Sequence, residues 1–123
     1  MRYGTWKSKN RHEYLLQYHI IFVCKYRKKL LMSKQISDDI KQFSYKICQK
    51  HKVIIGYMET DKDNIHYMIE TEPTMSISKI VNLMKSYTTY HIWKRYPNYL
   101  RKHFWNEHTF WTDGYFEMFQ KKC

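Results

Sequence analysis

The chain has 123 residues, with 22 Lys and Arg against 11 Asp and Glu, which gives a formal net charge of +11. This charge favours a polyanionic partner, nucleic acid above all, over a basic surface that only contacts solvent. One domain with a real core fits this length, while the short apolar runs and the polar N-terminus exclude a membrane span and a signal peptide and predict a cytoplasmic protein. Its three cysteines lie far apart without a C-x-x-C pair, which excludes a disulfide framework and a zinc knuckle.

The first part of the chain predicts an arm followed by a strand. Residues 1–12 are basic and polar and predict a flexible arm, so the single domain is expected over residues 13–123. The apolar, β-branched run over residues 13–25 predicts a central strand. A basic segment around an aromatic ring follows, formed by Lys25, Arg27, Lys28 and Lys29. These side chains can bind a phosphate backbone, and charge that only keeps the sheet edge soluble is an equal alternative.

A helix and a hairpin are predicted next. Ser33 can cap a helix whose core stripe recurs at helical spacing, at Ile36, Ile40, Phe43 and Ile47. Residues 52–60 predict a second strand, and a polar turn leads from it into a third strand that ends before Pro73.

The third strand has two unlike faces. Ile65, Tyr67 and Ile69 form an apolar face that can be buried. The other face carries Asn64, His66, Met68 and Glu70 at two-residue spacing, so an amide, an imidazole and a carboxylate lie along one side of the strand. Such groups can converge on one ion or phosphate, so this face is the candidate site, and a half-exposed polar pair without a ligand is the alternative.

The last third of the chain predicts a helix over residues 76–96, stopped by Pro97, and then a strand over residues 109–119 interrupted at Asp113 and Gly114. The segment between them predicts an irregular stretch with a short helical turn. Four side chains on the polar side of the long helix suit phosphate contacts or simply a solvated face: Lys85, Tyr87, Lys94 and Arg95.

The predicted order is strand, helix, strand, strand, helix, strand. This order predicts an α+β, ferredoxin-like βαββαβ fold, with an antiparallel sheet and two helices on one face. The other face of the sheet is then free for nucleic acid.

Several segments in this order resemble the single-tyrosine transposases of the insertion sequence 200/605 family. The resemblance covers nearly the whole chain and is carried by Tyr-His-Ile-Ile-Phe-Val-Cys-Lys-Tyr-Arg-Lys-Lys at residues 18–29, by Thr-Asp-Lys-Asp-Asn-Ile-His-Tyr-Met-Ile-Glu at 60–70, and by residues 76–81, 104–105 and 110–116. It implies a homodimer that recognises DNA hairpins and cuts single-stranded DNA beside them. It also implies a tyrosine nucleophile and a divalent ion, Mg²⁺ or Mn²⁺, that polarises the phosphate.

The chain departs from the family pattern at two places. The family's His-hydrophobic-His motif corresponds to Asn64, Ile65 and His66, so the metal ligands implied here are His66 and the amide oxygen of Asn64. The family's nucleophile lies on a further helix after the last strand, to which no tyrosine of this sequence corresponds, so the catalytic residue is unassigned. We therefore expect a protein of DNA transposition that binds single-stranded or hairpin DNA and is catalytically incomplete in this form.

Three alternatives remain open at this stage. The chain can be an active metal-dependent nickase or transposase that uses another tyrosine. It can be an RNA-binding module on the same fold, although the glycine- and aromatic-rich signature of that module is absent from the third strand. It can also be a structural remnant that keeps its dimerising sheet alone.

Overall fold

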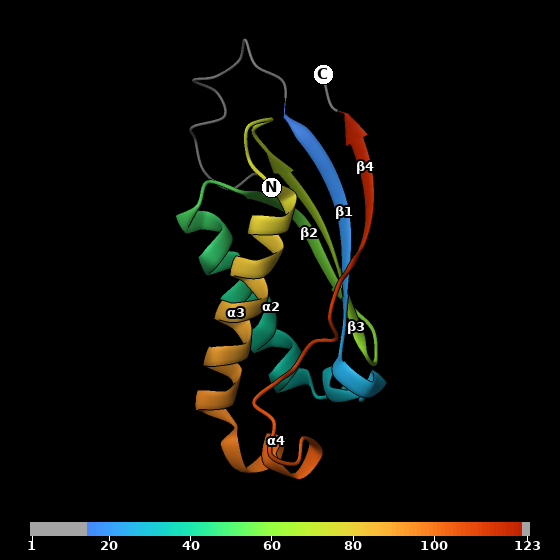
Figure 1. Cartoon of the computed structure of the whole chain (residues 1–123), viewed down its shortest axis with the longest axis vertical. Coiled ribbons are helices and arrows are strands. Elements are labelled where there is room, and N and C mark those ends of the chain that lie inside the picture. The colour runs from blue at the N-terminus through green and yellow to red at the C-terminus, as the bar shows by residue number, and fades with distance from the viewer. Residues whose placement is uncertain (1–14, 122–123) are drawn as a thin grey trace.

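A four-stranded sheet with helices on one of its faces forms the body of the molecule (Figure 1). The computed structural model describes residues 15–121, so the arm predicted over residues 1–12 lies outside the described residues. Two short 3-10 turns, η1 and η2, connect the first strand to the first long helix. The elements in chain order are β1 (Leu16–Val23), η1 (Lys25–Arg27), η2 (Leu30–Met32), α2 (Lys34–Lys50), β2 (Ile54–Thr60), β3 (Asn64–Thr71), α3 (Ile77–Arg95), α4 (Pro97–His103) and β4 (Phe116–Lys121).

The sheet has the strand order β2-β3-β1-β4, and every neighbouring pair is antiparallel. This order confirms the ferredoxin-like βαββαβ prediction, because each long helix connects two strands that have a third strand between them. Within the sheet, β3 and β1 are the two central strands. The candidate site on β3 therefore has neighbouring side chains on both sides.

The last strand differs from its prediction over residues 109–119. Strand β4 begins at Phe116, and the stretch before it makes one isolated bridge, Cys24 to Trp111. Phe110 and Trp111 are consecutive and both buried, at 0% and 5% exposure. A strand sends consecutive side chains to opposite faces, so two adjacent core residues favour an irregular segment instead. Gly114, with φ +79°, then turns the chain into β4.

Both long helices follow their predictions closely. The Ser33 hydroxyl accepts a hydrogen bond from the Ile36 amide at 3.2 Å and caps α2, whose predicted stripe of Ile36, Ile40, Phe43 and Ile47 is buried. Helix α3 ends at Arg95, and Pro97 begins the short helix α4, as its fixed φ allows. Within the described part of the chain, no helix combines the length and the apolar character that crossing a membrane requires.

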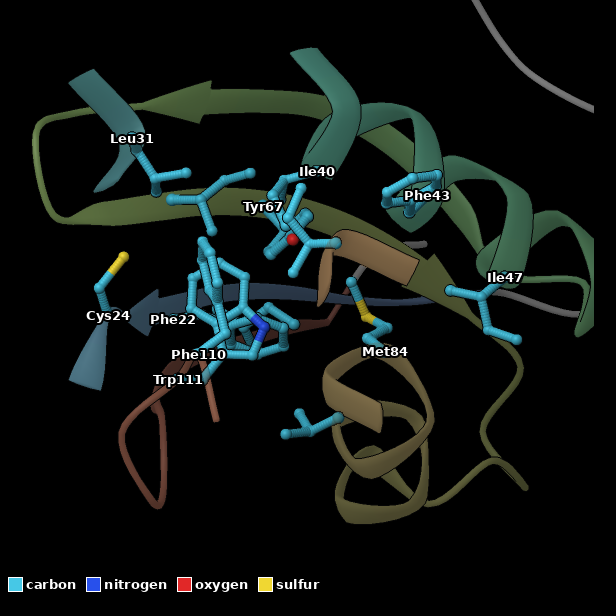
Figure 2. Close-up of a cluster of buried hydrophobic side chains, with 14 of the residues drawn as sticks. Phe22, Cys24, Leu31, Ile40, Phe43, Ile47, Tyr67, Met84, Phe110 and Trp111 are labelled. Carbon is cyan, nitrogen blue, oxygen red and sulfur yellow. The ribbon is translucent and has the colours of Figure 1, made fainter. Parts of the chain in front are cut away.

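The core lies between the sheet and the two helices. Figure 2 shows Phe22, Phe110 and Trp111 beside one another, and the Phe22 ring centroid lies 5.1 Å from that of Tyr67 and 5.4 Å from that of Trp111. The Tyr67 hydroxyl is 2.7 Å from the Ser44 hydroxyl, and complete burial raises the pKa of Tyr67. Burial also raises the pKa of the free Cys24 thiol to about 12, so this thiol is neutral.

Candidate functional site

The open face of the sheet, on the side away from α2 and α3, gathers polar side chains from three strands. Tyr18, Ile20 and Phe22 are buried in the core, so alternation turns the intervening β1 residues to the open face. The register pairs His19 with Met68. On the other side of β3, the register pairs Met68 with Tyr57 of β2.

Two histidines meet on this open face. Nδ1 of His66 lies 3.3 Å from Nε2 of His19, and the two ring centroids are 5.4 Å apart. The Tyr57 hydroxyl lies 3.4 Å from the same His19 nitrogen, and the Tyr57 side chain is 42% exposed. We call His19, His66 and Tyr57 the histidine cluster. Both histidines are half-buried, so a small ligand can reach them.

His19 and Tyr57 were not predicted as site residues. Residues 13–25 were interpreted as one continuous apolar run, which hid the outward position of His19. The signal that identifies it is the two-residue alternation of Tyr18, Ile20 and Phe22, combined with the ferredoxin-like strand order that sets β1 beside β3.

Asn64 is held by a charged neighbour. Its side-chain amide donates to the Asp63 carboxylate at 2.8 Å, and the same carboxylate accepts a bond from Nε of Arg27 at 3.0 Å. These two donors hold the pKa of Asp63 below its usual value, the bond from Asn64 contributing most. The remaining Asn64 oxygen is buried and has no hydrogen-bond partner among the described residues. Asn64 thus keeps a free acceptor oxygen.

The lowered pKa of Asp63 predicts how stability changes in acid. A carboxylate with a depressed folded-state pKa contributes stability above its unfolded pKa of about 4, and this contribution is lost as the pH falls through the folded value. Asp63→Asn should therefore lose less stability between about pH 5 and pH 3 than the wild type. Urea unfolding midpoints at the two pH values measure the difference, and parallel losses in both proteins would contradict the role of this carboxylate.

The metal site implied by the resemblance fits the chain in part. The free Asn64 oxygen and the half-buried imidazole of His66 are donors that Mn²⁺ accepts. Over the described residues, however, no three His, Cys, Asp or Glu side chains are gathered into a ready metal centre. Glu70, predicted on the same face, is 2% exposed, and its carboxylate accepts a hydrogen bond from the Gln17 side-chain amide at 3.4 Å. Water or phosphate oxygens would have to complete the coordination.

A second feature is a basic groove of about 780 Å³ between α3 and the segment that precedes β4. Lys85 donates to the carbonyl oxygens of Thr112, at 2.8 Å, and of Gly114, and so ties that segment to the helix. Tyr90 in the wall is 62% exposed. The groove is lined by Asn82, Lys85, Ser86, Thr89, Tyr90, Trp93, Lys94, Pro97, Arg101, His108, Thr109, Trp111, Thr112, Asp113 and Gly114.

The four side chains of α3 that were predicted to contact DNA lie on two different sides of the helix. Lys85 and Lys94 line the basic groove. Tyr87 and Arg95 lie instead on the side of α3 that faces α2, where Nη1 of Arg95 is 3.0 Å from Asp39 and the Tyr87 ring packs against Phe43. Arg101, Tyr90 and His108 of the groove were not predicted, because they come from two helices and a loop that only the fold brings together.

The other predicted DNA contacts follow β1 in the turn that contains η1. Arg27 is paired with Asp63 at 3.0 Å, and Nζ of Lys25 is 4.0 Å from the Glu107 carboxylate. Lys28 is half-buried and Lys29 is exposed. The start of this turn lies beside the loop between β2 and β3, as shown by the hydrogen bond from the Cys24 amide to the Asp63 carbonyl at 2.8 Å. Arg27 therefore lies near the Asn64 end of the site, whereas Lys25 lies beside the segment that precedes β4, where its amide donates to the Phe110 carbonyl at 2.8 Å.

Comparisons with known proteins agree with this architecture. Residues 12–120 match the profile of a family described as "Transposase IS200 like". The chain is 25% identical over 109 residues to the ISDra2 transposase TnpA of Deinococcus radiodurans, covering 89% of this chain and 76% of the relative. It is 26% identical over 113 residues to the transposase for insertion sequence element IS200 of Salmonella typhimurium, covering 92% and 72%.

Two solved structures share the fold. One is a protein from Deinococcus radiodurans described as a transposase, with a TM-score of 0.77, 23% identity, and coverage of 85% of this chain and 78% of that chain. The other is a REP-associated tyrosine transposase bound to a REP hairpin, with a TM-score of 0.61, 12% identity, and coverage of 90% and 59%. At these identities the similarity shows the fold alone.

Proposed function

Because the chain belongs to the IS200-like transposase family, we propose that it takes part in DNA transposition by binding single-stranded DNA that carries a hairpin. The observation that carries the proposal is the basic groove, in which Lys94, Arg101 and the exposed ring of Tyr90 lie together. A net charge of +11 supports a polyanionic ligand in general. One protein of the same fold is bound to a REP hairpin, which favours a hairpin ligand here.

The groove residues suit this ligand in distinct ways. Lys94 and Arg101 are exposed, so their charges can neutralise phosphates and release counterions. Tyr90 offers a ring face on which an unpaired base can stack, and Nζ of Lys94 lies 5.7 Å from the centre of that ring. Lys85 has a structural role, because its hydrogen bonds to the Thr112 and Gly114 carbonyls hold the segment that precedes β4 against α3.

We propose that the open face of the sheet receives a phosphate of the bound DNA, at the position where the family motif would place the phosphate that is cut. Asn64 and His66 are the residues that the family motif offers to Mg²⁺ or Mn²⁺, an ion that when bound stabilises charge on phosphoryl oxygens. A neutral amide in place of the motif's first imidazole weakens this site. We therefore propose that the chain in this form binds DNA without cutting it. Because the resemblance to the family implies a homodimer, we also propose that it binds DNA as one.

Fluorescence anisotropy with three labelled strands tests the binding. The strands are a single-stranded DNA with a hairpin, a DNA of the same composition that cannot pair, and the RNA counterpart of the hairpin. We expect the DNA hairpin to bind most tightly and its affinity to fall steeply with salt. Equal, salt-insensitive binding of all three would refute the proposal, and tighter binding of the RNA would favour the RNA-binding module.

A denaturing gel of the same DNA hairpin, incubated with the protein and Mn²⁺, tests the absence of cleavage. We expect intact strands and no covalent protein-DNA adduct. An adduct would identify an active transposase and overturn the proposed incompleteness. Light scattering of the protein in solution tests the homodimer, which a monomeric mass would exclude.

A further inference from the structure

We propose that His19 and His66 form a divalent transition-metal site across β1 and β3, in which His19 supplies the imidazole that position 64 lacks. The proposal deepens the metal part of the proposed function and rests on it, but not on DNA binding. It differs from the motif-based assignment because His19 lies outside the motif, 47 residues before His66.

The distance between the two nitrogens fits a shared ion. Nδ1 of His66 and Nε2 of His19 are 3.3 Å apart. Two imidazole nitrogens at about 2.1 Å from one ion, at a near-tetrahedral angle, are separated by about 3.3 to 3.4 Å. The same separation is within hydrogen-bonding distance, although it is longer than the usual about 2.9–3.0 Å of a hydrogen bond from an N–H group to oxygen. The observed separation is therefore compatible with two ligands of one ion without large movement of either ring.

The two nitrogens can share either a proton or a metal ion. Without an ion, one ring in its N–H tautomer can donate a hydrogen bond to the other, and an ion that displaces this proton would be bound by a lone pair from each ring. The Tyr57 hydroxyl approaches the same His19 nitrogen at 3.4 Å and adds an oxygen at the edge of the site. The His66 nitrogen and the Tyr57 oxygen thus both approach Nε2 of His19 on the open face.

The backbone holds the two histidines in place before any ion binds. His19 and His66 belong to the two central strands, whose ladder pairs Leu16 through Val23 with Thr71 through Asn64. The residues that flank them, Ile20 and Tyr67 among others, are 0% exposed and prevent the strands from rotating. A site held this way loses little entropy when it binds its ion, because its ligands are already ordered.

The donor set predicts which ions bind. Imidazole suits Zn²⁺, Ni²⁺ and Co²⁺, whereas Mg²⁺ prefers carboxylate, carbonyl and water oxygens. Glu59 is the carboxylate directly opposite His66, and it is exposed rather than gathered with the histidines. We therefore infer that the site selects Co²⁺, Ni²⁺ or Zn²⁺ over Mg²⁺.

Titration with Co²⁺, followed by visible absorption and by calorimetry, tests the proposal on the whole chain without DNA. We expect saturable binding of one ion per chain and no matching heat with Mg²⁺. His19→Gln and His66→Gln should each weaken Co²⁺ binding by about ten-fold or more, and the double variant should lose little further, since one imidazole alone no longer chelates. His103→Gln, a half-buried histidine on α4, is the matched control and should bind as the wild type does.

Two results would overturn the proposal. One is unchanged Co²⁺ binding in His19→Gln together with a large loss of Co²⁺ affinity in Asn64→Ala. This result would show that Asn64 and His66, and not His19, bind the ion. The other is Mg²⁺ binding as tight as Co²⁺ binding in the wild type, a measurement that needs no variant to fold. Metal-free hairpin binding by the same proteins separates this failure from failure of the proposed function, because the histidine cluster lies outside the basic groove.

Discussion

Phe22→Ala is expected to lower the free energy of unfolding by about 3–5 kcal/mol. The Phe22 ring is 0% exposed and packs between Tyr67 of β3 and Trp111 of the segment before β4. Removing it opens a cavity where β1, β3 and that segment meet, and close-packed neighbours relax only in part. Urea unfolding followed by circular dichroism measures the change in midpoint at constant slope.

Trp105→Ala is the matched control for this core substitution. It removes an aromatic ring as well, but the Trp105 side chain is 84% exposed, so a change within about 0.5 kcal/mol is expected. A similar small change at Phe22 would contradict the packing of the core around this ring. It would also weaken the placement of the segment that forms one wall of the basic groove.

The double variant Lys94→Gln, Arg101→Gln is expected to weaken hairpin DNA binding by about ten-fold or more at low salt. Both side chains are exposed in the basic groove, where each can neutralise a phosphate. The slope of log affinity against log salt should become less steep by about 1.4 to 1.8, which corresponds to two lost phosphate contacts. Fluorescence anisotropy over a salt series measures both quantities.

The control for this charge change is Lys46→Gln, Lys50→Gln on α2. Both lysines are exposed and lie outside the groove, and the net charge again falls by two, from +11 to +9. We expect at most a small loss in this variant. An equal loss in the two double variants would show that overall charge, and not the groove, binds the DNA. Lys85 is left intact in both because its bonds to Thr112 and Gly114 shape the groove.

The elements that the sequence predicted well are those decided by neighbours in the chain. Ser33 and the stripe that begins at Ile36 predicted α2, since a cap and a 3.6-residue period act within one helix. The two faces of β3 followed from its alternation, and Ile65 and Tyr67 are buried as expected. The strand over residues 109–119 was wrong in its first half, because apolar character alone does not distinguish a strand from a buried loop.

The candidate site was predicted only in part for a related reason. The sequence shows that His66 lies on the outer face of a strand, but it does not show which side chain of the next strand lies within reach. That depends on the register, which pairs His19 with Met68 and so sets His19 on the diagonal from His66. The groove was hidden in the same way, since Lys94 and Arg101 lie on two helices and Thr112 on a loop.

By itself, the sequence determined the strand and helix order, the basic character of the protein and the resemblance to a transposase family, because these depend on local pattern and composition. Only the tertiary structure decided that His19 meets His66 and that a loop closes a basic groove against α3. The physical reason is that contacts between residues distant in the chain depend on strand register and core packing, which are properties of the whole fold.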